Sequence, residues 1–175
     1  MFTFRPESGP YGPRVQDAHV GQGDDVAGEV ERLYREQGDR MWRAVLAFAG
    51  DGEIASDAVA EAFAQALRRG DAIRDPARWV WRSAFRIAAG MLKERRSIEP
   101  EQDVGVSYEM DLPARELVDA LRRLSPRQRA SVVLHHAAGY PVREVAAILG
   151  STPAAVKVHL KRGRDRLRKT LSEEA

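Results

Sequence analysis

The sequence contains no cysteine, and this absence excludes disulfides, thiolate metal sites and thiol catalysis at once. No apolar run approaches the roughly 18 residues that a membrane-spanning helix needs. The first residues also lack the apolar core of a secretory signal. Runs that alternate between polar and apolar residues, the pattern of a half-buried strand, are missing as well. We therefore expect an all-α protein that stays in the cytoplasm without membrane insertion.

Motifs of enzyme catalysis are missing too. The chain has no phosphate-binding glycine loop, dinucleotide fingerprint, zinc-protease motif or hydrolase nucleophile elbow. The adjacent histidines His135 and His136 would point about 100° apart on a helix, so they are poorly placed to share a metal ion. One of the two rings should be exposed. We expect no catalytic residues, no metal and no cofactor.

Charge is unevenly distributed along the chain, although the net charge is only +2. Residues 112–175 carry 13 basic and 6 acidic side chains, whereas residues 97–111 carry five acidic and no basic ones. The acidic stretch has no helical stripe, which indicates a linker. We predict a flexible arm over 1–28, a helical domain over 29–96, this linker, and a second helical domain over 112–171.

Apolar residues recur at helical spacing in both domains. The first domain should contain helices over about 26–49, 53–69 and 76–96, the last of them capped by Asp75. In the second domain we expect helices that start at 112 and 126, followed by helices over 142–149 and 153–171. The apolar stripes that we expect to be buried include Val30, Leu33, Tyr34, Met41, Val45, Phe48, Val59, Phe63, Leu67, Leu117, Val118, Leu121, Leu124, Val156, Leu160, Leu167 and Leu171.

The stretch over 144–169 has the features of a helix-turn-helix unit, in which two helices cross steeply through a short turn. Gly150 can adopt the left-handed conformation that ends the first helix. Ala146 is small enough for the crossing point. Thr152 can cap the second helix, and Val156 anchors that helix inward.

The face opposite Val156 begins with small residues and continues with cations. This pattern suits a helix whose N-terminus enters the major groove of DNA. A basic amphipathic surface helix is the alternative, but the turn, the cap and the anchor together favour DNA binding. The expected contacts are Ser151, Thr152, Ala154, Ala155, Lys157, Val158, Lys161, Arg162 and Arg164.

The helix over 76–96 carries a second candidate nucleic-acid surface. Its candidate contacts are Arg78, Trp79, Arg82 and Arg86. Interleaved cations and aromatic rings suit single-stranded nucleic acid, in which bases stack and phosphates pair. Aromatic residues at helical spacing also form ordinary helix cores, and Trp81 and Phe85 fit packing against the first helix. Taken alone, the pattern supports both interpretations equally.

The order of these parts resembles bacterial sigma-70 family factors of the extracytoplasmic-function (ECF) type, over about residues 29–171. The segments "LRRLSPRQR", "REVAAILG" and "AAVKVHLKRGRDRLR" are similar to region 4 of that family, and "SDAVAEAF" with "ARWVWRSAFRIAAGMLKERR" resembles region 2. The implied fold is all-α, with a region 2 helical bundle and a region 4 helix-turn-helix domain joined by the short acidic linker.

The resemblance implies a subunit of RNA polymerase that directs promoter recognition and transcription initiation without chemistry of its own. Residues 151–164 would read the minus-35 promoter element, and the third helix would bind the melted minus-10 element. The helices within 112–138 would dock on the polymerase flap. An anti-sigma factor is a further partner that the resemblance implies.

A motif on the second helix is implied to bind core RNA polymerase. Asp57, Glu61 and Phe63 match the family pattern Asp-x-x-Gln-Glu-x-Phe, whose residues contact the polymerase clamp helices. Ala60 stands where the family usually has Gln, and Arg86 stands where Asn is common.

A two-domain transcriptional regulator with a LuxR-like helix-turn-helix domain is the alternative. Such a regulator would bind duplex DNA by itself, as a dimer on paired half-sites. A sigma factor would instead bind core polymerase tightly and free promoter DNA poorly. The two therefore differ in what the first domain contacts.

Overall fold

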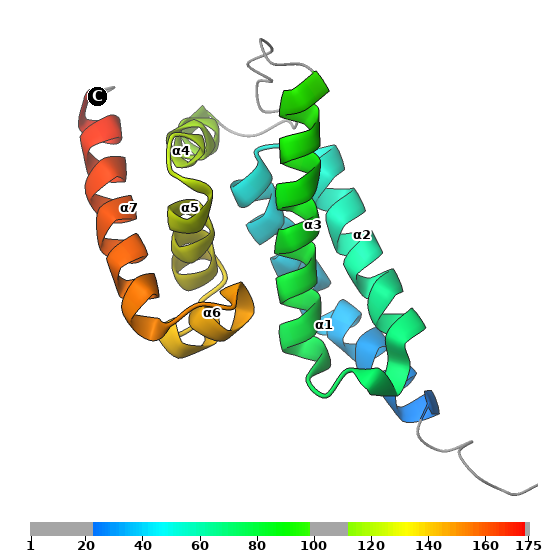
Figure 1. The fold of residues 1–175 in the computed structure, drawn as a ribbon. Helices are drawn as coiled ribbons and strands as arrows, with labels where there is room; N and C mark the ends of the chain where they lie inside the picture. The colour runs from blue at the N-terminus through cyan, green and yellow to red at the C-terminus, as the bar shows by residue number, and fades with distance from the viewer. Residues whose placement is uncertain (1–22, 99–111, 174–175) are drawn as a thin grey trace, which may run out of the picture.

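The computed structural model describes residues 23–98 and 112–173, and the regular structure within these ranges is entirely helical (Figure 1). The helices are α1 (Gly23–Ala49), α2 (Gly52–Arg69), α3 (Pro76–Ile98), α4 (Leu112–Arg122), α5 (Pro126–Val132), α6 (Val142–Leu149) and α7 (Pro153–Glu173), with a 3-10 turn η1 (Gly70–Ala72) and a π-helical turn η2 (Val133–Ala137). The all-α prediction is confirmed for these ranges. Residues 23–28, the end of the predicted arm, belong to α1, and residues 97–98, the start of the predicted linker, belong to α3. The rest of the arm and of the linker lies outside the described residues.

Helices α1, α2 and α3 pack together, and we call them the N-terminal bundle (Figure 1). Gly50, with a φ of 71°, ends α1. Asp51 then caps α2 by accepting a hydrogen bond from the Ile54 N–H at 2.9 Å. Asp75 caps α3 in the same way, because its side chain accepts a hydrogen bond from the Arg78 N–H at 3.0 Å. Both caps fix where a helix starts, and so fix which of its faces meets the core.

The aromatic residues of α3 divide between the core and the surface. Trp81 is fully buried, and Phe85 is nearly so, with its ring centroid 5.1 Å from that of Phe48 on α1. The core interpretation is therefore confirmed for these two residues. Trp79 is only half-buried, which leaves part of its ring accessible.

Helices α4 to α7 form the C-terminal bundle. Ser125 begins α5 with the predicted capping box, in which its side chain and that of Gln128 bond each other's backbone N–H groups. The predicted single helix from 126 ends differently, because η2 replaces its last turn and the Ala138 N–H bonds the Val133 carbonyl at 2.9 Å. Within η2, His135 Nδ1 lies 2.7 Å from the Tyr140 carbonyl oxygen. His136 is the exposed ring of the pair, as predicted.

Four apolar side chains that the stripes placed in the core are exposed instead. They are Tyr34 (57%), Leu67 (54%), Leu117 (46%) and Leu171 (37%). Tyr34 and Leu67 flank an open groove between α1 and α2, which no other described element fills. The buried stripe of each of these helices is thus narrower than its apolar periodicity predicted.

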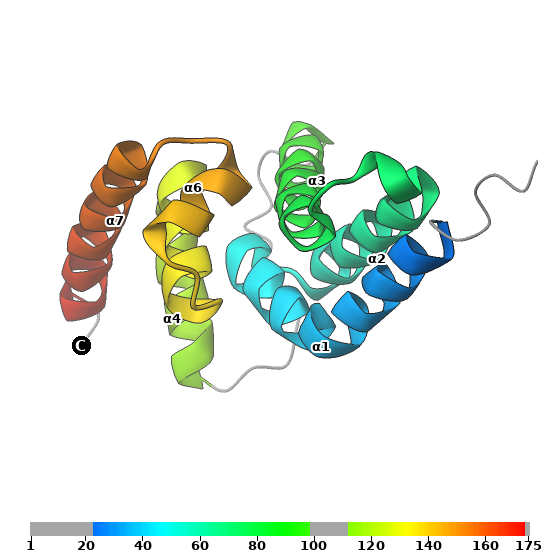
Figure 2. The same cartoon turned by 90° about the horizontal axis from the view of Figure 1, so that it is seen from below.

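The two bundles lie against each other rather than apart. Helix α6 packs on α3, while α4 and η2 pack on α1. Figure 2 shows α6 between α7 and α3, and α7 at the outer edge of the molecule. The buried apolar residues form one cluster that includes members from both bundles.

Candidate nucleic-acid and polymerase interfaces

The predicted helix-turn-helix is formed by α6, the turn 150–152 and α7. Gly150 has φ 60° and ψ 43°, the left-handed conformation expected of it. The Ser151 N–H donates to the Ala146 carbonyl at 2.8 Å, which closes the end of α6. Thr152 Oγ1 accepts from the Ala155 N–H at 3.2 Å and so caps α7. Val156 is fully buried, and its role as the inward anchor is confirmed.

Helix α7 is held close to α5 by a second glycine. A Cβ at Gly163 would lie 2.8 Å from Val132 Cγ2, closer than carbon atoms can approach. Gly163 is accordingly buried, on the side of α7 that faces α5. This close approach fixes the rotation of α7, and hence the direction in which its outer face points.

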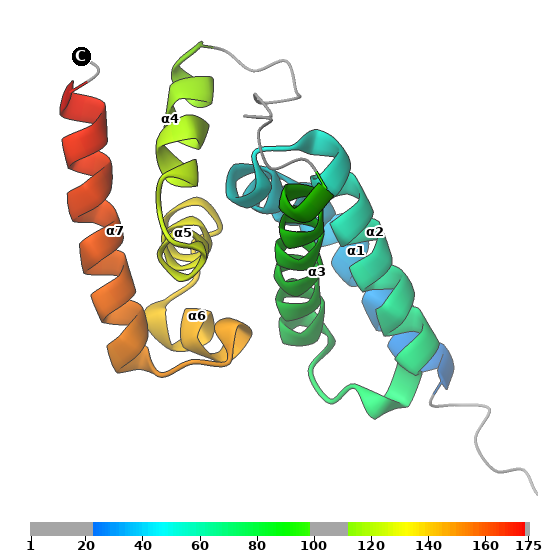
Figure 3. The same cartoon turned by 45° about the horizontal axis from the view of Figure 1, so that its top comes forward.

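The outer face of α7 is a free cationic surface. Of the nine predicted contacts, all are exposed except Ala155, which is half-buried, and Val158 keeps 46% of its surface accessible. In the part of the chain that the structure describes, no ion pair engages Lys157, Lys161 or Arg162. Figure 3 shows α7 at the edge of the molecule, with one side away from the other helices. The arrangement can accept a polyanion without first breaking contacts.

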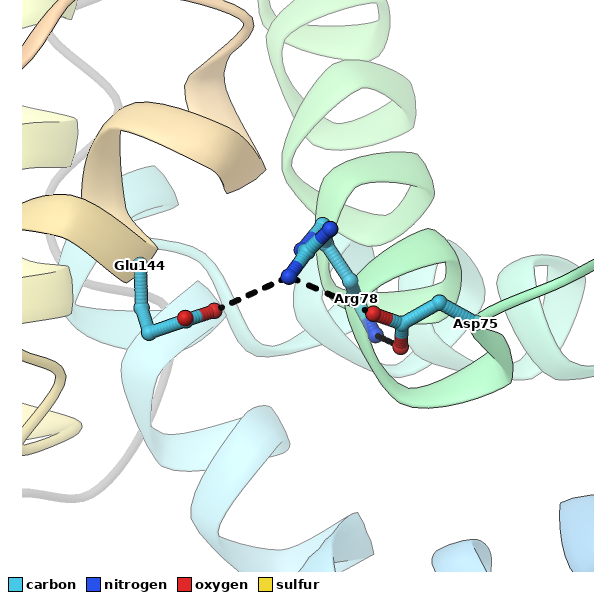
Figure 4. A network of polar contacts seen from close by, with 3 residues as sticks. All are labelled: Asp75, Arg78 and Glu144. Carbon is cyan, nitrogen blue, oxygen red and sulfur yellow. Dashed lines mark hydrogen bonds and ion pairs between the residues drawn. The ribbon is translucent and has the colours of Figure 1, made fainter.

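The candidate surface on α3 is partly engaged with the C-terminal bundle. Arg78 Nη2 lies 3.4 Å from Asp75 Oδ2 and 3.5 Å from Glu144 Oε2 on α6 (Figure 4). Arg82 lies against Gly150, so that a Cβ there would be 3.0 Å from Arg82 Nη2. Sequence reasoning did not foresee that the two candidate nucleic-acid surfaces touch.

The remaining α3 candidates lie on either side of this contact. The guanidinium of Arg69 lies 5.5 Å from the ring centroid of Trp79. Arg86 is exposed and, together with Arg82 and His159, lines a cavity of about 330 Å³ between the bundles. The cavity combines an apolar floor, which includes Phe85 and Ile148, with a cationic rim.

The predicted polymerase contacts lie on α2 beside the α1–α2 groove. Asp57 is exposed, and Glu61 accepts hydrogen bonds from Gln65 and Arg68, each at 2.8 Å. The hydrogen bond from Gln65, followed by the interaction with Arg68, lowers the pKa of Glu61 below its usual range. Phe63 is buried and packs edge-on against Tyr34, with ring centroids 5.1 Å apart. Phe63 therefore shapes this surface from beneath.

The groove itself was missed by sequence reasoning. It has a volume of about 630 Å³, and its lining includes Tyr34, Trp42 and Leu67. The signal for it was present, because Tyr34 and Leu67 lie at the edges of their apolar stripes. Periodicity alone does not distinguish the edge of a core from the wall of a groove.

Residues 23–98 and 112–173 contain neither a candidate metal site nor a helix that could cross a membrane. Three or more histidine, aspartate or glutamate side chains nowhere come together in these ranges as a metal site would require. Likewise, none of the described helices has the length and apolar character that crossing a membrane demands.

Comparison with known proteins places the chain in a family. The family model described as "Sigma-70, region 4" matches residues 114–167. The ECF RNA polymerase sigma factor BldN of Streptomyces coelicolor is 28% identical over 92% of this chain and 66% of its own length. The ECF RNA polymerase sigma factor SigL of Mycobacterium tuberculosis is 29% identical over 82% of this chain and 89% of its own length. The chain belongs to the ECF type of the sigma-70 family.

The fold of this sigma factor also occurs in solved structures. The sigma factor RpoE of Bartonella quintana, solved in complex with the anti-sigma factor NepR, has a TM-score of 0.66 and is 20% identical. The match covers 85% of this chain and 98% of that one. Because the matches to the relatives extend well beyond region 4, the alternative of a LuxR-like regulator is not supported.

Proposed function

We propose that this sigma factor directs core RNA polymerase to promoters and acts in transcription initiation in the cytoplasm. The observation that carries the proposal is the exposed cationic face of α7, which is presented by a correctly capped helix-turn-helix within the region 4 match. The surface needs no cofactor, because backbone amides and cations supply all the charge that DNA requires.

Region 4 would read the minus-35 element through the N-terminal half of α7. Ala154 and Val158 are small or apolar and exposed, so they can approach base edges in the major groove. Lys157, Lys161 and Arg162 extend from the same helix toward phosphates on either side. Ser151, Thr152, Ala155 and Arg164 complete the proposed contact set.

The N-terminal bundle would bind the melted minus-10 element through α3. Arg78, Arg82 and Arg86 recur at four-residue spacing and are all exposed, which suits phosphates along one strand. The accessible part of the Trp79 ring offers a stacking surface for a base. We assign residues 29–96 to region 2, and residues 97–111 to the linker that joins it to region 4.

The α1–α2 surface would bind the clamp helices of core polymerase. Asp57 and Glu61 follow the groove-lining residues Ser56 and Ala60 in α2 and supply negative charge beside the groove, while Phe63 forms part of its lining. The exposed apolar side chains of Tyr34 and Leu67 would be covered in the complex. Helices α4 and α5 would dock on the flap. We further propose an anti-sigma factor as a partner, because the structural relative RpoE was solved with one.

Reconstitution with core polymerase tests the proposal. We expect the full chain to bind core enzyme and to produce specific transcripts from promoter-containing fragments. A variant with Lys157, Lys161 and Arg162 all changed to alanine serves as the matched control, and it should bind core but lose the specific transcripts. A chain that neither binds core nor supports any specific transcript would overturn the proposal.

A further inference from the structure

The outer face of α7 has an apolar centre. Ala154 and Val158 are both exposed, and Val158 keeps 46% of its surface accessible. Val158 is two residues from the buried anchor Val156, so at 100° per residue it points about 160° away from it. Ala154 lies one turn earlier and only about 40° away around the helix. The two side chains form a single apolar surface opposite the protein interior, which we call the Val158 patch.

Folding does not account for a valine at this exposed position. Valine is a poorer helix former than alanine, lysine or arginine, because its branched side chain loses freedom in a helix. Single exposed apolar residues are common on protein surfaces, but this one is surrounded by the cations Lys157, Lys161 and Arg162. None of the three has an ion pair in the part of the chain that the structure describes. The patch therefore points to what α7 binds.

The flanking cations determine what the Val158 patch faces. Lys157 and Arg162 lie about 100° and 40° from Val158, in opposite directions around α7. In the proposed complex they reach phosphates on the two sides of the major groove, since phosphates line both of its edges. Val158 then points between the two rows of phosphates, toward the edges of the base pairs.

The base edges in the major groove are polar with one exception. Guanine, adenine and cytosine present hydrogen-bond donors and acceptors there, whereas thymine also presents its C5-methyl group. Valine and alanine side chains have neither donor nor acceptor. Against a polar edge they displace water without replacing its hydrogen bonds, which costs free energy. Against a thymine methyl group they bury apolar surface on both molecules, which is favourable.

We infer that Val158 is a specificity-determining residue of α7, and that it selects a base pair whose thymine methyl group faces it in the major groove. Ala154 makes the same kind of contact with a neighbouring base pair. The two residues are about 6 Å apart along the helix, less than two base-pair steps of about 3.4 Å. The inference rests on the proposed function, since it names the base that the proposed minus-35 reader selects.

The structure holds the Val158 patch in a fixed position. Thr152 caps the helix at its start, and Val156 anchors it inward. The close approach of Gly163 to Val132 fixes the rotation of the helix. In addition, a branched side chain such as that of Val158 has one strongly preferred conformation in a helix. Little conformational freedom is left to lose on binding, so the contact favours the matching base at a low entropic cost.

Removal of single methyl groups from the DNA gives the first test. Holoenzyme reconstituted from core polymerase and the full chain selects fragments from a pool with a randomised promoter region, and a selected fragment becomes the probe. Each thymine of its upstream element is then replaced by deoxyuridine, which lacks only the C5-methyl group. At one or two neighbouring positions we expect the holoenzyme to bind about fourfold more weakly, the effect of one buried methyl group.

Val158→Ala connects the methyl group to this residue. At the sensitive position the variant should bind the thymine and deoxyuridine fragments with affinities within about twofold of each other, because the coupled partner is gone. The variant is expected to fold, since the position is exposed and alanine is the better helix former. Arg162→Ala is the matched control. It should weaken binding of both fragments and keep the ratio of about fourfold, because phosphate contacts carry no sequence information.

Restoring the methyl group on another base gives the second test. Cytosine in place of the sensitive thymine should weaken binding, and 5-methylcytosine should recover part of the loss, because it carries a methyl group at the same ring position. The recovery should be seen with the wild-type chain and be absent with Val158→Ala. A recovery of the same size in both would assign the contact to another residue.

Two further results contradict the inference. One is a selected element in which no thymine is sensitive to deoxyuridine, and the other is equal sensitivity in the wild-type chain and Val158→Ala. Specific transcripts from the same fragments separate this from the proposed function. If the holoenzyme produces them while every deoxyuridine substitution is neutral, only the inference is wrong. If the chain forms no holoenzyme and supports no specific transcript, the proposed function fails and the inference fails with it.

Discussion

The guanidinium of Arg129 lies 4.9 Å from the ring centroid of Phe48, and this contact joins α5 to α1. Arg129 is almost completely buried, and among the described residues its Nε has no hydrogen-bond partner. Burial, and then the charges of Arg96 and Arg122, lower the pKa of Arg129 to about 10. A buried cation in this setting costs free energy that its apolar stem and its stacking on the ring must offset.

Replacing this cation by a neutral side chain of similar length should therefore not destabilise the protein. We expect Arg129→Met to leave the free energy of unfolding unchanged or to raise it by up to about 2 kcal/mol. Arg129→Ala removes the stem as well and should lower it by about 1–3 kcal/mol. Urea denaturation at pH 7 measures both. An equal loss in the two variants would show that the charge itself stabilises the fold.

Sequence reasoning succeeded where the determinants are local. Gly150, Thr152 and Val156 lie within seven residues of one another, and each acts on the backbone or on an adjacent helix, so their roles were readable from spacing. The caps at Asp75 and Ser125 were predictable for the same reason.

Contacts between distant segments were not readable in this way. The hydrogen bond from Arg78 to Glu144 joins residues 66 positions apart, and nothing in either helix specifies the other as its partner. Arg129 also lies in a stretch that reads as a polar helix start, and only the assembled structure shows that it is buried. Periodicity predicts which face turns inward, but not what covers it.

The crossing of α5 and α7 should depend on the absence of a side chain at Gly163. Gly163→Ala places a Cβ 2.8 Å from Val132 Cγ2, and we expect it to lower the free energy of unfolding by about 1–2 kcal/mol despite the better helix propensity of alanine. Gly90→Ala is the matched control, because that helical glycine has no atom within 4 Å of the added Cβ. It should raise the free energy of unfolding by about 0.5–1 kcal/mol. Two changes of the same sign and size would contradict the close approach.

The Tyr140 hydroxyl should make stability depend on pH in the alkaline range. Burial raises the pKa of Tyr140 above its usual value, although Arg40 opposes the shift. Because the pKa is higher in the folded state, the neutral hydroxyl contributes fully to the free energy of unfolding below the ordinary tyrosine pKa of about 10. This contribution is lost as pH rises through the pKa of the folded state. Unfolding free energies measured between pH 9 and 11 should therefore fall more steeply for the wild-type chain than for Tyr140→Phe. Parallel profiles would show that Tyr140 is hydrated in solution.

Arg162 should contribute a phosphate contact in the promoter complex. Its side chain is exposed on α7, and we expect Arg162→Ala to weaken binding of promoter DNA by the holoenzyme and to reduce the salt dependence by close to one unit of slope. Binding measured over a range of salt concentrations gives both quantities. Arg35→Ala removes another exposed cation, one on α1 that is far from α7 in the sequence and paired with Glu31, and should leave the slope unchanged. An unaltered slope for Arg162→Ala would remove this residue from the phosphate contacts.

Asp57 should act on polymerase binding alone. It is exposed on α2 beside the α1–α2 groove, and loss of one interfacial charge of this kind amounts to about 1 kcal/mol. We expect Asp57→Ala to weaken core affinity roughly fivefold, while the free chain's affinity for nonspecific duplex DNA stays the same. Glu53→Ala is the matched control, since Glu53 is an acid in the first turn of the same helix whose side chain is 85% exposed and lies 4.0 Å from Arg95. Because both variants lose one negative charge, a difference between them reports the location of the charge rather than its amount. Equal core affinities for Asp57→Ala and the wild-type chain would contradict the assignment of Asp57 to the clamp surface.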